Sequence, residues 1–229
     1  MNSPKALKIS KRLLAAADLA KDNEFIADVG TDHAYLPIYL YTSGKIRGAV
    51  VSDINEGPIE RAKRNILEFS AEDGIIPVLS DGLSKIDEYS PDTVFILGMG
   101  GELILNIISA AEWVRAKRPR LVLQPMTHPE LLRGYLLENG FEITQELFVE
   151  DGKIYQLIEA VYTDKSTDAN ALELHFGKIN LLRREPILLY AMRREADILK
   201  ARIEGKRTAG LSAGDDGELL RMINEYENL

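Results

Sequence analysis

The stretch "DTVFILGMGGELILNIISAAEWVRAK" at residues 92–117 decides the fold class. Its apolar beginning is typical of a buried strand, and three glycines and a methionine separate it from an amphipathic segment that predicts a helix. The same alternation recurs on both sides of this stretch. Strands that alternate with helices predict βαβ units and a mostly parallel sheet with helices on both faces.

Six further runs share this strand-like character and lie before and after that stretch. They are "FIADVG" (25–30), "RGAVVSDI" (47–54), "IPVLSDGL" (76–83), "RPRLVLQPM" (118–126), "FEITQELFVE" (141–150) and "KIYQLIEAVY" (153–162). The dipeptide "DG" at 151–152 separates the last two and is a strong hairpin signal. We therefore expect an α/β fold with one antiparallel strand at or near the edge of the sheet.

A different pattern begins with the polar run "TDKSTDANA" at 163–171. Beyond it, apolar residues recur with coiled-coil spacing, namely Leu189, Met192, Ala196, Leu199 and Ile203. Pro186 is expected to open this helix, 205–217 to form a flexible turn, and residues 219–226 to return as a last short helix. We predict a domain at 1–162 and a helical hairpin at 163–229, which serves packing, dimerisation or contact with a large partner.

Composition narrows the class of protein. The net charge is −8, which counts against a strongly basic nucleic-acid binder as an average, although basic clusters stand at 8–12, 61–64, 115–120, 183–184 and 193–194. The absence of cysteine and of an apolar run of about 20 residues predicts a cytoplasmic protein with no membrane span. Metal binding is not expected, because the three histidines are far apart in sequence.

The expected strand ends carry acidic residues. Asp28 and Asp32 lie on either side of Gly30, and this loop lacks the G-x-G-x-x-G pattern of a dinucleotide site. Two carboxylates would repel a pyrophosphate and suit a cationic or hydroxyl-rich ligand. Asp53 is placed to accept hydrogen bonds from a ribose, and Asp81 from an exocyclic amine.

These acids predict a pocket for a nucleoside that carries positive charge and no phosphate. S-adenosyl-L-methionine (SAM) has this composition: a ribose, an adenine, an amino acid and a sulfonium. Each acid taken alone could equally cap a helix or serve a loop.

Several segments together resemble the bacterial tRNA adenine-N1 methyltransferase family of TrmK type, which acts on adenine 22. They are "ADVGTDHAYLPIYL", "SDINEGPIERAKRNI", "LSDGL", "GMGGELI", "RLVLQPM" and "EDGKIYQLIEA". The resemblance covers roughly residues 7–162. It implies a Rossmann-like class I methyltransferase sheet, with SAM as cofactor, tRNA as substrate and a C-terminal helical coiled-coil hairpin.

The same resemblance implies roles for residues at the strand ends. The first loop would wrap the methionine part of SAM, Asp53 would hold the ribose, and Asp81 and Gly82 would meet the adenine edge. The full cofactor set is Asp28, Gly30, Thr31, Asp53, Ile54, Asp81, Gly82 and Gly98. The first loop departs from the family pattern of class I methyltransferases, which usually has more glycines.

"GMGG" stands where adenine amino-methyltransferases often carry an Asn/Asp-Pro-Pro-aromatic motif, which favours attack by a ring nitrogen. Asp32 is the candidate for stabilising positive charge, with His33 as a second catalytic candidate. The substrate-binding candidates are Tyr35, Met99, Gly100, Gly101 and Gln124. Structural roles are the alternatives: hydrogen bonding for His33, packing for Tyr35 and Met99, and strand termination for Gln124.

Two other functions compete with methyl transfer. One is a nicotinamide-dependent oxidoreductase, against which the missing glycine pattern argues. The other is a non-catalytic module that binds SAM or a nucleotide and recruits partners through its coiled coil. The oligomeric state is open between a monomer and a dimer formed by the tail.

Overall fold

The computed structural model describes residues 7–228, so residues 1–6 and 229 of the two predicted domains lie outside it. The chain divides into two compact units, Met1–Thr167 and Asp168–Leu229. The predicted domain boundary at 162/163 falls shortly before this division. No helix within the described residues is both long and apolar enough to cross a membrane.

The first unit contains a seven-stranded sheet in the order β3-β2-β1-β4-β5-β7-β6. The neighbours from β3 to β5 are parallel, whereas β7 is antiparallel to both β5 and β6. The predicted mostly parallel sheet with one antiparallel strand near its edge is thus confirmed. The strands are β1 (Glu24–Val29), β2 (Ile46–Asp53), β3 (Ile75–Leu79), β4 (Thr93–Met99), β5 (Arg120–Pro125), β6 (Phe141–Asp151) and β7 (Lys153–Tyr162).

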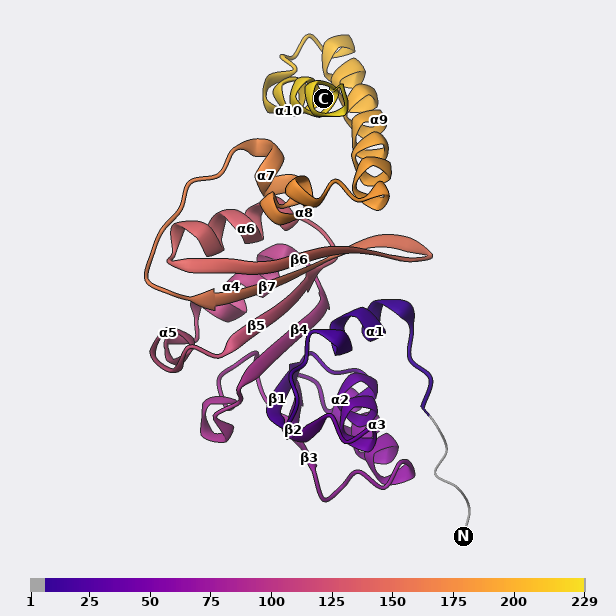
Figure 1. Cartoon of the computed structure of the whole chain (residues 1–229), viewed down its shortest axis with the longest axis vertical. Coiled ribbons are helices and arrows are strands. Elements are labelled where there is room, and N and C mark those ends of the chain that lie inside the picture. The colour runs from indigo at the N-terminus through magenta and orange to yellow at the C-terminus, as the bar shows by residue number, and fades with distance from the viewer. Residues whose placement is uncertain (1–6, 229) are drawn as a thin grey trace. The chain divides into compact units, whose positions relative to one another are not determined.

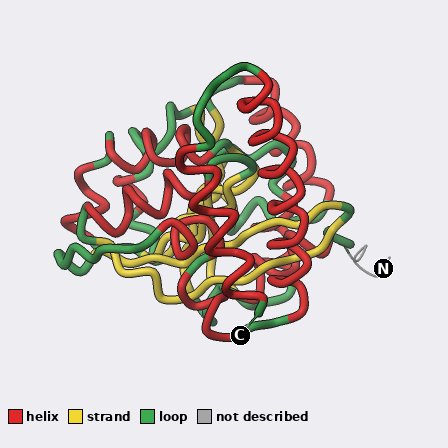
Figure 2. The backbone as a smooth tube through the Cα atoms, turned by 90° about the horizontal axis from the view of Figure 1, so that it is seen from above, coloured by secondary structure: helices red, strands yellow, loops and turns green. Residues whose placement is uncertain are grey.

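Helices cover both faces of this sheet, as Figure 1 shows for α1, α2 and α3 on one side and α4 and α6 on the other. Figure 2 shows the strands in yellow between red helices. The helical elements are α1 (Lys11–Asp18), α2 (Tyr35–Thr42), α3 (Glu56–Glu68), the 3-10 turn η1 (Asp87–Tyr89), α4 (Gly101–Ser109), α5 (Glu112–Lys117) and α6 (Pro129–Glu138).

Successive residues of each buried strand pack against opposite layers. Ile26 belongs to the cluster formed with α1, α2 and α3, and its neighbour Ala27 to the cluster formed with α4, α5 and α6. Because both faces are covered, the central strands are continuous apolar runs. This burial explains why apolar runs in the sequence located these strands.

The second unit is helical: α7 (Ala171–Phe176), α8 (Lys178–Arg183), α9 (Pro186–Thr208) and α10 (Gly214–Glu227). Pro186 opens α9 as predicted, and α10 packs along α9. The turn predicted at 205–217 is wrong in extent, because only residues 209–213 separate the two helices. Leu188 is fully buried, whereas the predicted seam residue Leu189 is half-buried.

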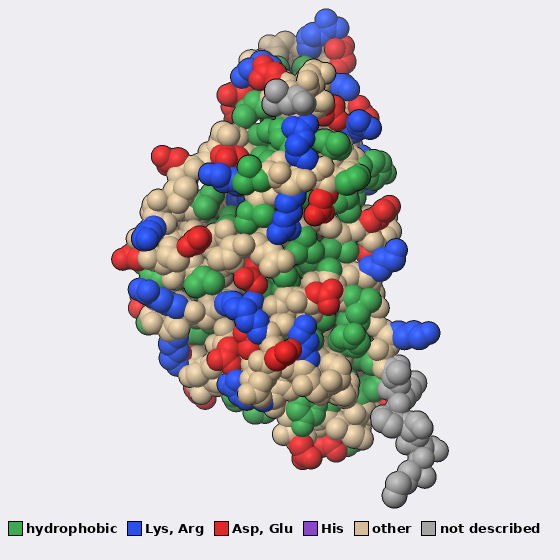
Figure 3. Space-filling model, viewed as in Figure 1, with side chains coloured by type: hydrophobic (Ala, Val, Ile, Leu, Met, Phe, Trp, Pro, Cys, Tyr) green, Lys and Arg blue, Asp and Glu red, His purple; other side chains and the backbone are tan. Residues whose placement is uncertain are grey.

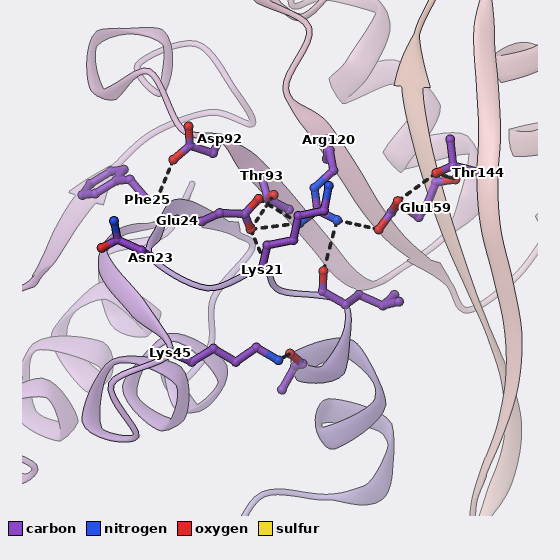
Figure 4. Close-up of polar contacts among 12 residues, drawn as sticks. Lys21, Asn23, Glu24, Phe25, Lys45, Asp92, Thr93, Arg120, Thr144 and Glu159 are labelled. Carbon is purple, nitrogen blue, oxygen red and sulfur yellow. Dashed lines mark hydrogen bonds and ion pairs between the residues drawn. The ribbon is translucent and has the colours of Figure 1, made fainter.

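A buried ion network joins five strands at the amino ends of the parallel strands (Figure 4). Arg120, which begins β5, donates to both carboxylate oxygens of Glu24 in β1 at 2.9 and 2.8 Å and to Glu159 in β7 at 2.6 Å. Thr93 in β4 donates to Glu24, and Thr144 in β6 donates to Glu159. These bonds fix the strands relative to one another at the end opposite their carboxyl termini.

We predict that Arg120→Met lowers the free energy of unfolding by about 3–5 kcal/mol, because Glu24 and Glu159, whose side chains are only 12% and 11% exposed, lose their counter-charge. Urea unfolding followed by the fluorescence of Trp113, the single tryptophan, measures this change in the first unit. Lys63→Met is the control, since it removes an exposed pair with Glu60 and should cost less than about 1 kcal/mol. Equal losses in the two variants would contradict the assignment.

Candidate active site

A pocket of about 330 Å³ lies at the carboxyl ends of β1 and β4. It is lined by Arg12 and Leu13 of α1, by Asp28, by the segment from Gly30 to Leu36, and by Leu97 and Gly98. Open α/β sheets bind ligands at this edge. Seven predicted site residues line it together: Asp28, Gly30, Thr31, Asp32, His33, Tyr35 and Gly98.

The first loop turns sharply at Gly30, which has a φ of +79°. The backbone N–H groups of Gly30 and Thr31 both donate to the carbonyl of Ser52 in β2, at 2.8 and 2.9 Å. A Cβ on Gly30 would lie 1.9 Å from the Cε methyl of Met99. The left-handed backbone favours glycine here, and a side chain would in addition displace the flexible end of Met99.

Asp28 ends its strand in a buried position, with 8% of its surface exposed. Burial raises the pKa of its carboxyl from 3.8 to about 6, against a smaller lowering by a hydrogen bond from the Thr31 side chain. No salt bridge to Asp28 occurs within residues 7–228. A cationic ligand in the pocket would supply the missing counter-charge.

Asp32 and His33 form a cluster with helix α3. Arg61 donates to Oδ1 of Asp32 from Nε at 3.0 Å and from Nη2 at 2.5 Å, and Nε2 of His33 lies 3.1 Å from the other carboxylate oxygen. The His33 ring stacks on Tyr35, with centroids 5.0 Å apart and planes at 10°. Asn65 donates to the carbonyl of His33. The loop thus presents a stacked pair of rings beside a carboxylate.

The next two strand ends carry the other acidic candidates. Asp53 ends β2, and its Oδ1 accepts from the backbone and side chain of Asn55, while Ile54 is 60% exposed. Asp81 and Gly82 follow β3 and line a second hollow of about 680 Å³ with side chains of α4 and α5. The structure therefore places these four predicted cofactor residues at the same edge of the sheet, outside the first pocket.

The "GMGG" stretch divides into two parts. Gly98 lies at a β-bulge with a φ of +79° and lines the pocket, whereas Met99, Gly100 and Gly101 do not. A Cβ on Gly101 would lie 2.4 Å from the carbonyl oxygen of His128. The absence of a side chain at Gly101 therefore allows α4 to pack against the loop after β5.

Gln124 is fully buried and contacts Arg12. Its Oε1 accepts from Nη1 of Arg12 at 2.5 Å, and its amide nitrogen donates to the carbonyl of Pro125 at 3.1 Å. In this arrangement Gln124 orients an arginine, and its predicted contact with a base edge stays a prediction.

Two site residues were missed as individuals by sequence reasoning. Arg12 and Arg61 were visible only as members of the basic clusters at 8–12 and 61–64, whose ordinary interpretation is a solvated surface. Arg120 of the cluster at 115–120 is buried in ion pairs instead of being available to phosphate. Within residues 7–228, no group of three or more His, Asp or Glu is arranged to hold a metal ion.

We predict that Asp28→Asn raises the free energy of unfolding at pH 7 to 8 by up to about 3 kcal/mol. The carboxyl holds its proton more tightly in the folded chain than in the unfolded chain, since its pKa rises from 3.8 to about 6. Wild-type stability therefore falls as pH rises from about 4 to about 6, and the asparagine variant avoids that loss. Urea unfolding of the wild type and the variant at several pH values from 4 to 8 measures this difference in stability. A variant that is equally stabilised at pH 4 and pH 8 would contradict this cause.

Known proteins resemble this chain in sequence and in fold. The methyltransferase domain family matches residues 9–158. The tRNA (adenine(22)-N(1))-methyltransferase of Bacillus subtilis (strain 168) is 34% identical over 174 residues, which is 76% of this chain and 73% of that protein.

Two solved structures extend the likeness to almost the whole chain. One is M. capricolum TrmK in complex with the natural cofactor product S-adenosyl-homocysteine (SAH), with a TM-score of 0.79, 28% identity and 96% of each chain covered. The other is a Streptococcus pneumoniae protein, a candidate tRNA (m1A22) methyltransferase, in complex with SAM; its TM-score is 0.86 at 29% identity, over 96% of this chain and 99% of that one. The chain belongs to the tRNA (adenine(22)-N(1))-methyltransferase family and carries its methyltransferase domain.

Proposed function

We propose that this protein transfers a methyl group from SAM to N1 of an adenine in tRNA, at position 22 as in its named relative. The observation that carries the proposal is the pocket at the carboxyl ends of β1 and β4, which holds a buried carboxylate and the open bulge at Gly98. Membership of a methyltransferase family leaves no support for the nicotinamide-dependent alternative.

The residues at this edge fit the parts of SAM. Asp28, Gly30 and Thr31 would hold the methionine part, since the buried carboxyl lacks a cation among the described residues. Asp53 and Ile54 would bind the ribose, because β2 lies beside β1 and ends with an exposed turn. The adenine would reach the strand end after β3, where Asp81 can accept from its amine and Gly82 lies close by.

SAM supplies a methyl group on a sulfonium when it is bound. The N1 lone pair of adenine would attack that methyl group, a new nitrogen–carbon bond would form, and the electron pair of the broken carbon–sulfur bond would stay on sulfur. No proton has to leave N1 first, so this chain contributes mainly position and electrostatics. The target base must leave its stack in the folded RNA to reach the pocket.

The loop after β1 is suited to receive such a base. The stacked rings of His33 and Tyr35 are 40% and 36% exposed and offer a surface for an adenine. Asp32 would stabilise the positive charge that develops on the base, and Arg61 would set the direction of its carboxylate. The roles of Asp32 and His33 rest on this placement.

tRNA binding by an acidic chain requires local cationic contacts. Lys and Arg side chains intermingle with Asp and Glu on the face shown in Figure 3. One role for α9 is RNA contact, in which its exposed arginines, such as Arg193 and Arg194, would bind phosphates. The alternative role is dimerisation, in which the exposed Tyr190 and Ile198 would pack against a second copy of the chain. As a tRNA-modifying enzyme the protein would work in the cytoplasm.

We expect labelled-methyl transfer from SAM to tRNA that lacks the modification, with N1-methyladenosine as the product nucleoside. Mass spectrometry of the digested tRNA identifies the product. A transcript with guanine in place of adenine 22 is the control and should accept no methyl group. An N6-methyl product would overturn the proposed attack by the ring nitrogen, and binding of SAM without transfer would favour the non-catalytic alternative.

We further expect Asp53→Ala and Asp32→Ala to act on different steps. Asp53→Ala should weaken SAM binding about 10- to 100-fold, because a charge-assisted hydrogen bond is lost. Asp32→Ala should lower the turnover at saturating SAM about 10-fold or more and leave SAM affinity within about 3-fold. Calorimetry and single-turnover kinetics separate the two effects. Asp73→Ala, an exposed acid before β3, is the control; parallel losses of binding and turnover in Asp32→Ala would make it a cofactor contact.

A further inference from the structure

Arg12 lines the active-site pocket, although it belongs to α1, a helix that precedes the first strand and does not follow a strand end. Three neighbouring strands hold it there. Its guanidinium donates to Gln124 of β5 and lies over the Tyr155 ring of β7, 5.3 Å from the centroid. Its backbone N–H donates to Asp151 at the end of β6 at 3.2 Å. The side chain is thus held by two strands and the backbone by a third, so the guanidinium has a defined position in the pocket.

Most of the hydrogen-bonding capacity of Arg12 has no acceptor in the protein. A guanidinium carries five N–H donors, and the bond to Gln124 is the one that its guanidinium makes within residues 7–228. No carboxylate in that part of the chain forms a salt bridge with it. The backbone hydrogen bond from Arg12 and, to a smaller extent, its charge lower the pKa of the Asp151 carboxyl, but the guanidinium lines the pocket with its remaining donors unused by the described part of the chain. Donors held in this way offer charge-assisted hydrogen bonds to an anionic ligand.

The charges in the pocket fit one kind of ligand. Arg12 supplies a fixed cation, and Asp28 supplies a buried carboxylate in the same cavity. An α-amino acid end carries the matching pair of groups, a carboxylate and an ammonium. A phosphate would match Arg12 alone and would meet the carboxylates of Asp28 and Asp32 in the same pocket.

We propose that Arg12 binds the carboxylate of the methionine part of SAM, while Asp28 accepts from its ammonium group. Gln124 and Tyr155 act as positioning residues that hold the guanidinium over Gly98, where a Cβ would lie 3.5 Å from Nη1. The inference rests on the proposed function, because it assigns a residue to the SAM site. It also gives α1 a role in cofactor binding and Gln124 a role other than contact with the base.

Decarboxylated SAM is the probe that isolates this contact, because it lacks only the carboxylate. Calorimetry with SAM, SAH and decarboxylated SAM is carried out on the wild type, Arg12→Met, Arg12→Lys and Lys21→Met. Arg12→Met should weaken SAM and SAH about 10- to 100-fold and decarboxylated SAM less than about 3-fold. Arg12→Lys should have affinities for SAM and SAH between those of the wild type and Arg12→Met. Lys21→Met, which removes an exposed cation nearby in the sequence, should bind all three ligands like the wild type.

Any other result contradicts either the proposed carboxylate contact of Arg12 or the proposed function. Equal losses for all three ligands in Arg12→Met would show damage to the pocket, and unchanged SAM affinity with weakened tRNA binding would assign Arg12 to an RNA phosphate. Should Arg12→Met fail to fold, the wild type still decides, because equal affinity for SAM and decarboxylated SAM would exclude any carboxylate contact. A wild type that binds neither SAM nor SAH would overturn the proposed function itself.

Discussion

The guanidinium of Arg120 is the constraint on which the arrangement of the sheet depends. It binds Glu24 of β1 and Glu159 of β7 from the first residue of β5. Thr93 and Thr144 extend the network to β4 and β6. With the amino ends fixed, the strand register brings Asp28 opposite Phe95 and Leu97 opposite Gln124 at the other end. The ion network and the strand register together hold β1, β4 and β5 side by side, and the carboxyl ends of β1 and β4 line the pocket.

The local sequence pattern was sufficient to predict the strands that are covered by helices on both faces. The strands of the sheet are apolar runs because helices cover both faces, and the hairpin at 151–152 follows from its turn residues. The segment 102–117, by contrast, breaks into α4 and α5 around Ala110 and Ala111. The helix α1 was not predicted either, because its decisive contacts, such as Arg12 to Gln124, join residues 112 positions apart.

In the site, too, some residues could be predicted from their neighbours in sequence, whereas others depend on contacts that form only in the folded chain. The acids at the strand ends could be named from the sequence because each follows its own strand. The meaning of "GMGG" could not, because Gly30 and Met99 come together only in the folded sheet and Gly101 meets the carbonyl of His128. Of that stretch, Gly98 opens onto the pocket while the other residues allow close packing. A glycine-rich stretch can thus serve a site through one residue and the scaffold through the rest.

The buried carboxyl of Asp28 argues for a cationic ligand more strongly than any motif. Its raised pKa means that folding must desolvate a carboxylate at neutral pH with only a hydrogen bond from Thr31 in partial return. An asparagine would fill the same space without that cost, so the carboxylate is accounted for by what it binds rather than by what it packs against. Arg12 stands in the same pocket with the opposite charge and an almost unused set of donors. Because neither group neutralises the other through a salt bridge among the described residues, the pocket keeps two separated charges of opposite sign, which a zwitterionic ligand can meet at both ends.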